Sequence, residues 1–279
     1  MGGTAVIGVH PTAIISDGAK LGEGVEIGPY AVIGSNVNIG RGTIIGPHAV
    51  IDGHTTIGDE CKIYAGASIG LPPQDLSYKD APTGVIMGNG CTVREYVTIH
   101  RGSKDPMTSI GNNCFIMNYA HIAHDCKVGN NVIMANGTTL GGHVEVGDFT
   151  VFGGLVVFHQ FVRIGRFNMV SGNSGTRVDL PPFAITDGRP LYVRGINVVG
   201  LRRGKVAAPV RSAIKEAYRL LYRSELNMAN ACERIEQEIE QFDEVKEIVQ
   251  FIRSSKRGVA RGNLGNSYDL SSEDDGRAE

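Results

Sequence analysis

A repeat of six residues constrains this chain more than any other feature. Large apolar residues recur at every sixth position from Val9 to Ile69, from Met87 to Ile99, and from Ile110 to Val170. A small or β-branched residue usually stands two positions earlier, and glycine often follows directly. A period of six fits neither an α-helix nor a simple alternating strand, whereas hexapeptide repeats are typical of parallel β-helices. The repeat therefore predicts stacked coils in which every sixth side chain points inward.

The predicted fold class is mainly β: a left-handed parallel β-helix followed by a small C-terminal α-helical domain. Three hexads per coil make a triangular prism, an exception to the usual right-handed crossover. Each coil buries its inner face only against its neighbours, and glycine is expected at the tight corners. We assign residues 1–190 to the prism. The repeat breaks near 71–86 and 100–109, which predicts two loops expelled from the coils.

Residues 191–256 are expected to form the helical domain, because apolar residues follow helical spacing there in three stripes. Asp243 is the expected N-cap of the last helix. Residues 257–279 are polar, glycine-rich and finally acidic, so we expect a flexible tail.

Composition excludes several classes of protein. The 279 residues contain no apolar run of about 18, so no transmembrane segment is expected. The first residues lack a basic start and an apolar core, which predicts a cytoplasmic protein without a signal peptide. Four of the five cysteines occupy the small-residue position of the repeat and are expected to be buried thiols. No nucleic-acid partner is expected.

Charge is concentrated in one segment. The chain has a formal charge of -2, but residues 177–223 carry ten Lys or Arg and only three Asp or Glu. A basic segment in a near-neutral protein suggests an anionic partner there.

Histidines gather in the second half of the repeat. Four of them come from neighbouring turns, and Asp125 directly follows one of these four: His121, His124, His143 and His159. A carboxylate beside an imidazole fixes its tautomer and favours the protonated ring, as a general base requires. No serine or cysteine has the setting of a nucleophile, so direct attack by a substrate group is expected.

The same histidines permit a second hypothesis. His121 and His124 are three residues apart, and imidazole is a common zinc ligand. A trimeric prism can share a metal between subunits. A metalloenzyme such as a γ-type carbonic anhydrase therefore remains an alternative on this fold.

Several motifs resemble one family, the UDP-N-acetylglucosamine O-acyltransferases of lipid A biosynthesis. The resemblance covers about residues 9–258. It rests on His121-Ile-Ala-His-Asp-Cys126, Gly142-His-Val144, Val157-Phe-His-Gln-Phe161, Gln74-Asp-Leu76, Val97-Thr-Ile-His-Arg-Gly102, and Asn197 followed by Gly200-Leu-Arg-Arg203.

The resemblance implies acyl transfer from acyl carrier protein to the 3-hydroxyl of UDP-N-acetylglucosamine, the first step of lipid A biosynthesis. By the family pattern His124 is the general base, Asp125 supports it, and the Gly142 N–H stabilises the oxyanion. The resemblance implies further substrate-binding residues in three sets. The sugar and its loop involve Gln74, Asp75, His121 and His143. The nucleotide and acyl-phosphopantetheine region involves His159, Gln160 and Asn197, and phosphate or carrier protein would meet Arg202 and Arg203.

The resemblance also implies an acyl-chain groove and an assembly. Met117 and Gly172 match groove positions, and a glycine there predicts a long (R)-3-hydroxyacyl chain. The family pattern implies a homotrimer with its sites between subunits. No cofactor or metal is implied, since acyl carrier protein delivers the acyl group as a co-substrate.

Three positions depart from the family pattern. Ser77 stands where lysine is common, Val199 stands where an acidic residue is common, and Gly204 stands where another basic residue is common. These departures concern nucleotide contacts and leave the proposed base untouched. They keep a 3-amino analogue of the UDP-sugar open as the acceptor.

Overall fold

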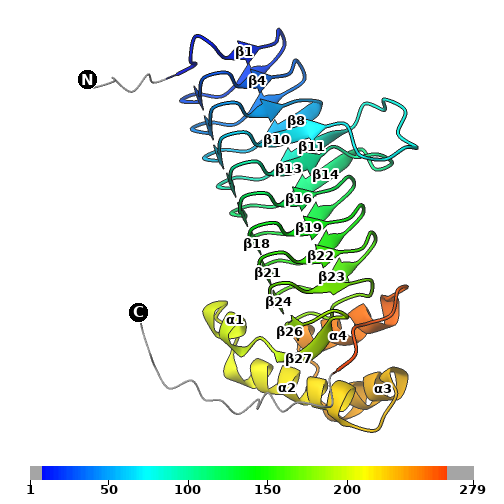
Figure 1. Ribbon diagram of the computed structural model, residues 1–279. Helices are drawn as coiled ribbons and strands as arrows, with labels where there is room; N and C mark the ends of the chain where they lie inside the picture. The colour runs from blue at the N-terminus through cyan, green and yellow to red at the C-terminus, as the bar shows by residue number, and fades with distance from the viewer. Residues whose placement is uncertain (1–7, 263–279) are drawn as a thin grey trace.

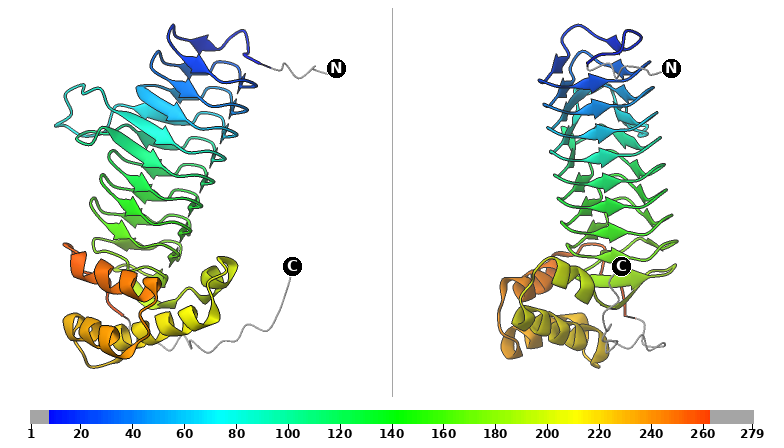
Figure 2. Two further views of the ribbon diagram at one scale, coloured as in Figure 1. Left: turned by 180° about the vertical axis from the view of Figure 1, so that it is seen from behind. Right: turned by 90° about the vertical axis from the view of Figure 1, so that its left-hand side faces the viewer.

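A computed structural model describes residues 8–262 as a tall three-sided prism with helices packed at one end (Figure 1). Figure 2 shows the same coils from behind and from the side, with the helices again beneath the last coil. The predicted fold, a left-handed β-helix followed by a small helical region, is confirmed.

The prism consists of three sheets, one on each side. The nine-stranded sheet contains β1 (Ile14–Ile15), β4 (Val32–Ile33), β7 (Val50–Ile51), β10 (Ser68–Leu71), β13 (Thr98–His100), β16 (His121–Ile122), β19 (Thr139–Leu140), β22 (Val157–Phe158) and β25 (Gly175–Thr176). The eight-stranded sheet contains β2 (Lys20–Leu21), β5 (Asn38–Ile39), β8 (His54–Ile57), β11 (Gly84–Met87), β14 (Met107–Ile110), β17 (Lys127–Val128), β20 (Glu145–Val146) and β23 (Arg163–Ile164). The ten-stranded sheet contains β3 (Glu26–Ile27), β6 (Ile44–Ile45), β9 (Lys62–Ile63), β12 (Thr92–Val93), β15 (Phe115–Ile116), β18 (Ile133–Met134), β21 (Val151–Phe152), β24 (Met169–Val170), β26 (Ala184–Asp187) and β27 (Tyr192–Ile196).

The register of the strands shows how the six-residue repeats stack into coils. Ile15 pairs with Ile33, and Ile33 pairs with Ile51, so regular coils are 18 residues long and contain three hexads. The repeat positions are buried through most of the prism, while Val9 at the open end is 43% exposed. The core is therefore one continuous stack of apolar side chains, mostly aliphatic.

The corners of the prism differ from the expectation that glycine would supply them. Many corner residues with a positive φ carry side chains, including Tyr119 (60°), Asp125 (61°) and His143 (60°). Asp, Asn and His tolerate this region better than most residues, but Tyr enters it at a cost. Backbone strain at some corners thus accompanies aromatic and ionisable side chains on the edges of the prism.

We name the corners for use below. The histidine corner comprises the turns from the nine- to the eight-stranded sheet, and it includes residues 123–126 and 141–144. The phenylalanine corner leads on to the ten-stranded sheet and carries Phe149, Phe167 and Phe183. The Met117 corner returns to the nine-stranded sheet and includes residues 117–120 and 171–174.

Both expelled loops leave the histidine corner. The first spans residues 72–83 between β10 and β11, and it projects from the prism in cyan in Figure 1. The second spans residues 101–106 between β13 and β14. Because both loops connect the same pair of sheets in adjacent coils, they lie next to each other.

The C-terminal helices cap the last coil. They are α1 (Val198–Arg203), α2 (Ala208–Arg223), α3 (Met228–Glu238) and α4 (Asp243–Ser254). The chain leaves the prism through β27, which pairs antiparallel with β26 and so extends the ten-stranded sheet past the expected boundary at residue 190. The expected N-cap Asp243 is wrong by one position: Phe242 is the cap and makes no side-chain cap bond, while Asp243 is in the first turn. None of these helices is long and apolar enough to cross a membrane.

The expected flexible tail is partly wrong. Val259 and Gly262 form β-bridges with Asp179 and Val193, and Arg257 donates a hydrogen bond to the Arg177 carbonyl (2.8 Å). Unpaired backbone groups of the last coil explain this attachment. The remaining residues of the expected tail, 263–279, lie outside the described residues. The five cysteines are buried free thiols.

Candidate active site

His124 and Asp125 form a hydrogen-bonded pair on the histidine corner. The His124 Nδ1–H donates to Asp125 Oδ2 at 2.7 Å, and the Asp125 side chain is fully buried while His124 remains 14% exposed. The backbone N–H of Asp125 donates to Thr108 Oγ1 (2.9 Å), which holds the corner in its positive-φ conformation. With Nδ1 occupied, His124 has Nε2 left for a substrate.

Backbone N–H groups of the 101–106 loop surround the other Asp125 oxygen. Ser103 N–H and Asp105 N–H donate to Oδ1 at 2.9 and 3.0 Å, and Lys104 N–H lies at 3.3 Å. Burial by itself raises the pKa of this carboxyl, but the hydrogen bonds from His124, Ser103 and Lys104 outweigh burial and lower it. Asp125 is therefore held as a carboxylate beside the imidazole.

His143 completes a cluster one coil further on. Its Nε2 lies 3.3 Å from Asp125 Oδ2, and its ring is perpendicular to that of His124 with centroids 5.3 Å apart. The opposite face stacks on Phe161 at 4.4 Å. Two imidazoles thus share one buried carboxylate oxygen.

His121 lies on β16 and faces out of the nine-stranded sheet. Its Nδ1 is hydrogen-bonded to Thr98 Oγ1 at 2.7 Å, and its ring packs edge-on against His100 at 4.9 Å. Burial, followed by the charge of His124, lowers the pKa of His121. A neutral His121 can accept or donate a hydrogen bond to a sugar hydroxyl.

Gly142 lies against the His124 ring. A Cβ at this position would meet His124 Cε1 and Nε2 at 2.6 and 2.7 Å, closer than atoms can approach. Among the hydrogen bonds of residues 8–262, none uses the Gly142 N–H. A free donor beside the free nitrogen of a base is the arrangement that an oxyanion site needs.

Asp75 projects from the 72–83 loop toward the same corner. It accepts hydrogen bonds from Ser103 Oγ (2.6 Å), from Ser77 N–H (2.8 Å) and from Ser77 Oγ. These bonds, with a smaller contribution from the charge of His124, hold the Asp75 pKa well below its usual range. Gln74, in the same loop, is exposed. Ser77 thus stabilises Asp75 within the loop, although lysine is common at this position in the family pattern.

His159 and Gln160 occupy the histidine corner in the next coil. Both are exposed, and Arg257 Nη2 lies 3.3 Å from His159 Nδ1. A hollow beside them is lined by apolar residues of β22 and by three positively chargeable groups: His159, Arg177 and Arg189. The hollow combines an apolar wall with positive charge.

The other predicted site residues lie on different corners of this chain. Asn197 caps α1, accepting from Gly200 N–H (2.9 Å) and donating to the Phe167 carbonyl (2.9 Å) on the phenylalanine corner. Arg202 and Arg203 are exposed on the same helix, together with Val199. Met117 and Gly172 lie on the Met117 corner, three coils apart. One chain therefore does not bring all the predicted residues together.

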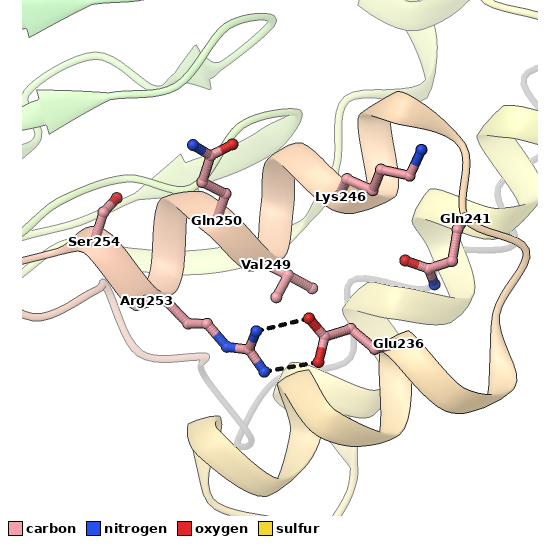
Figure 3. A pocket seen from close by; sticks show the side chains of 7 residues that line it. All are labelled: Glu236, Gln241, Lys246, Val249, Gln250, Arg253 and Ser254. Atoms are coloured by element: carbon pink, nitrogen blue, oxygen red, sulfur yellow. Dashed lines mark hydrogen bonds and ion pairs between the residues drawn. The ribbon is translucent and has the colours of Figure 1, made fainter.

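A separate hollow lies between α3 and α4 (Figure 3). A two-pronged ion pair between Arg253 and Glu236 (2.6 and 2.7 Å) joins the helices at its floor, as the dashed lines show. Its lining mixes both signs of charge and contains no histidine, so it is distinct from the histidine corner.

Sequence reasoning missed three residues of the site. Ser103 binds both Asp75 and Asp125, Thr98 holds His121, and Thr108 holds the Asp125 backbone. The short motif around His100 signalled the neighbourhood of Thr98. Ser103 lies in a loop outside the repeat phase, where periodicity gives no information.

One group among the described residues has donor atoms suited to a metal ion. The ligand atoms of His124, Asp125 and His143 lie within 4.8 Å of one another. However, the Asp125 carboxylate already accepts from His124 and from the 101–106 loop, so an ion here would have to displace those hydrogen bonds.

Comparisons with known proteins agree with this fold. A family model described as UDP N-acetylglucosamine O-acyltransferase, domain 2, matches residues 179–260, and the bacterial transferase hexapeptide model matches residues 18–53, 36–70 and 107–142. The prism and the second-domain match define a hexapeptide-repeat acyltransferase.

Individual relatives narrow this class. Proteins named acyl-[acyl-carrier-protein]–UDP-N-acetylglucosamine O-acyltransferase from Thermodesulfovibrio yellowstonii and Burkholderia orbicola are 49% and 46% identical, each covering 91% of this chain and 99% of the relative. The UDP-N-acetylglucosamine acyltransferase structure from Campylobacter jejuni superposes with a TM-score of 0.87 at 40% identity, covering 91% of this chain and 100% of that one. This chain belongs to the UDP-N-acetylglucosamine O-acyltransferases of lipid A biosynthesis, as the motifs predicted.

Proposed function

We propose that this enzyme transfers a (R)-3-hydroxyacyl chain from acyl carrier protein to the 3-hydroxyl of UDP-N-acetylglucosamine, the first step of lipid A biosynthesis, in the cytoplasm. The observation that carries the mechanism is the His124–Asp125 pair, whose Nδ1–Oδ2 hydrogen bond leaves His124 Nε2 free. No cofactor takes part, because the carrier-protein thioester is itself the activated acyl donor.

His124 is the general base of the proposed reaction. Its Nε2 removes the proton of the sugar hydroxyl as that oxygen attacks the thioester carbonyl carbon. Asp125 keeps the proton on Nδ1 and stabilises the imidazolium that forms. When the tetrahedral intermediate collapses, the C–S bond breaks and the imidazolium returns the proton to the departing thiolate. No covalent acyl-enzyme is needed.

The Gly142 N–H is the proposed oxyanion donor. It adjoins the His124 ring, and a side chain at this position would fill the space that the tetrahedral carbon needs. His121, His143 and Asp75 are the proposed sugar contacts, since all three present polar atoms around His124.

We infer that the enzyme works as a homotrimer. The predicted residues lie on three different sides of one chain. The histidines are on or beside the histidine corner, and Met117 and Gly172 are on the Met117 corner. Asn197, Arg202 and Arg203 belong to α1 and its cap, which Asn197 joins to the phenylalanine corner. Three-fold packing would bring corners of neighbouring chains together and complete each site. Met117 and Gly172 of one chain would then line the acyl groove beside another chain's histidines.

The nucleotide and the carrier protein are proposed to approach from the helical end. His159 and Gln160 lie between the histidine cluster and that end, near Arg177 and Arg189. Together with Arg202 and Arg203 they offer positive charge to the pyrophosphate and to an acidic carrier protein.

An acyl-transfer assay tests the proposal. Metal-stripped protein is given UDP-N-acetylglucosamine and 3-hydroxyacyl carrier proteins of several chain lengths, and a parallel reaction contains the 3-amino UDP-sugar. His124→Ala should lower transfer by roughly 10² or more. Asp125→Asn should also impair it, because the amide would direct its NH₂ group at Nδ1 and move the imidazole proton to Nε2.

His10 lies in the first coil of the prism, at the end opposite the helices. His10→Gln is therefore the matched control and should keep full activity. Transfer that persists in His124→Ala within a few-fold would contradict the base assignment. Failure to transfer with any donor or acceptor, together with about one zinc or iron per subunit in the protein as purified, would favour the metalloenzyme alternative. Transfer only to the 3-amino sugar would correct the acceptor.

A further inference from the structure

Ser103 is the one residue of the 101–106 loop that touches both carboxylates of the site. Its hydroxyl donates to Asp75 Oδ2 at 2.6 Å, and its backbone N–H donates to Asp125 Oδ1 at 2.9 Å. Asp75 belongs to a different loop, 28 residues earlier in the chain. A single residue therefore links the proposed sugar-binding carboxylate to the proposed catalytic one.

The hydrogen bonds of Asp75 leave room for a ligand. Three donors reach it: the Ser77 N–H, the Ser77 hydroxyl and the Ser103 hydroxyl. A carboxylate has about four acceptor positions, so about one remains for a substrate hydroxyl. The Ser77 donors move with Asp75 because they belong to the same loop. Among the hydrogen bonds of residues 8–262, the one from Ser103 alone fixes the carboxylate relative to the prism.

Other contacts between the two loops do not involve this carboxylate. The Thr83 hydroxyl donates to the Gly102 carbonyl at 2.6 Å, and Arg101 Nε donates to Tyr78 Oη at 3.0 Å. Neither contact involves Asp75 or Asp125. The 101–106 loop is itself anchored through its N–H groups to the buried Asp125.

We propose that Ser103 is a positioning residue that sets the place of Asp75 relative to His124, and so determines how tightly the acceptor sugar binds. The proposal rests on the proposed function, in which Asp75 contacts the sugar. Asp125 then has a second task besides orienting His124, since it anchors the loop that carries Ser103.

Steady-state kinetics of Ser103→Ala test this role. The variant keeps its backbone N–H on Asp125, so the catalytic pair is intact and kcat should stay within about twofold, with an unchanged acid limb of the pH–rate profile. KM for UDP-N-acetylglucosamine should rise about tenfold, as loss of a charge-assisted hydrogen bond that orders a binding group predicts. KM for acyl carrier protein should not change.

Two variants serve as controls. Ser103→Thr restores the hydroxyl and should return KM close to the wild-type value. Thr83→Val removes a different hydroxyl-mediated bond between the loops without touching either carboxylate, and it should leave KM for the sugar near the wild-type value. An equal rise in Thr83→Val would overturn the proposal, because loop tethering in general would then explain the effect.

A double-mutant cycle with Asp75→Ala separates this inference from the proposed function. If Ser103 acts through Asp75, Ser103→Ala should add nothing to the rise in KM that Asp75→Ala causes. The coupling would be overturned if Ser103→Ala added its full effect in the double variant. It would also be overturned if Ser103→Ala had the wild-type KM while Asp75→Ala was impaired. In both cases the sugar contact of Asp75 would stand. Wild-type KM in both single variants would overturn the sugar contact and the coupling together.

Discussion

At the residue scale, the site contains buried ionisable groups that differ in how many hydrogen-bond partners they have. Asp125 is buried with several donors and stays charged. His100 is buried in the adjacent coil, 7% exposed, and its Nδ1 has no hydrogen-bond partner among residues 8–262. The same burial therefore stabilises a charge at one position and penalises it at the other.

His100 should make stability depend on pH. Burial first, and then the charges of His121 and His124, lower the pKa of His100 from 6.5 to about 4. Because the folded-state pKa lies below the unfolded one, protonation favours the unfolded chain. The stability that the neutral His100 side chain contributes is fully present above pH 6.5 and is lost as pH falls from about 6.5 toward about 4. Linkage gives a loss of roughly 3 kcal/mol over this range.

Urea unfolding of wild type and His100→Gln at several pH values measures this effect. The variant has no group that titrates at this position, so its free energy of unfolding should fall less between pH 6.5 and 4. Parallel curves for the two proteins would show that His100 does not carry the dependence.

The sequence predicted the histidine cluster because those residues keep the repeat phase, so that His124 and His143 had to lie in neighbouring coils. The N–H groups of residues 103–105 could not be predicted, since backbone donors carry no residue-type signal. Asn197 illustrates a different limit. An asparagine before a helix is also an N-cap signal, and in this chain both ends of its amide are used inside the fold.

At the element scale, two arginines of the prism contact α4: Arg163, which donates to Ser254 Oγ, and Arg166. Arg166, on the phenylalanine corner, donates from Nε to Glu247 Oε2 at 2.8 Å and lies 3.6 Å from Glu244, both on α4. Its guanidinium also lies over the Phe183 ring, 5.0 Å from the centroid. Burial raises the pKa of Glu247, and Arg166 opposes that rise.

Arg166→Ala should loosen α4. It removes a half-buried ion pair and its packing on an aromatic ring, so we expect a loss of about 2 kcal/mol, between the values typical of exposed and buried pairs. Hydrogen exchange should increase in α4 before it increases in the coils. Arg219→Ala breaks an exposed pair with Glu216 on α2 and should change stability far less, because solvent screens that pair. Similar losses in the two variants would contradict a docking role for Arg166.

The helices could be predicted where apolar residues follow helical spacing. The apolar stripes indicated helices where α2, α3 and α4 lie, but Phe242 caps α4 although it offers no side-chain bond. Residues 257–262 looked like a tail because their composition is polar and glycine-rich. They are attached instead through backbone bonds to the last coil, which composition does not report.

At the scale of the whole molecule, the prism is a one-dimensional stack, and this part was the most predictable from sequence. A strict six-residue phase fixes which side chains are buried, and an 18-residue coil fixes which of them touch. Phase alone does not say which surface of the stack meets another chain. The three separate corners that carry the predicted site residues became apparent only from the order of the sheets.

The stack predicts that the cost of a cavity depends on the coil in which it is made. Ile33 is fully buried and has Ile15 and Ile51 as its column neighbours. Ile15, one coil earlier, is half-buried and has Ile33 as its single strand partner among residues 8–262. Ile33→Ala should therefore cost about 3–4 kcal/mol and Ile15→Ala about 1–1.5 kcal/mol, because an end coil loses fewer contacts and can relax. Urea unfolding at one fixed protein concentration measures both. Equal losses would contradict the stacking argument, since the end coil would then be as well packed in solution as an inner one.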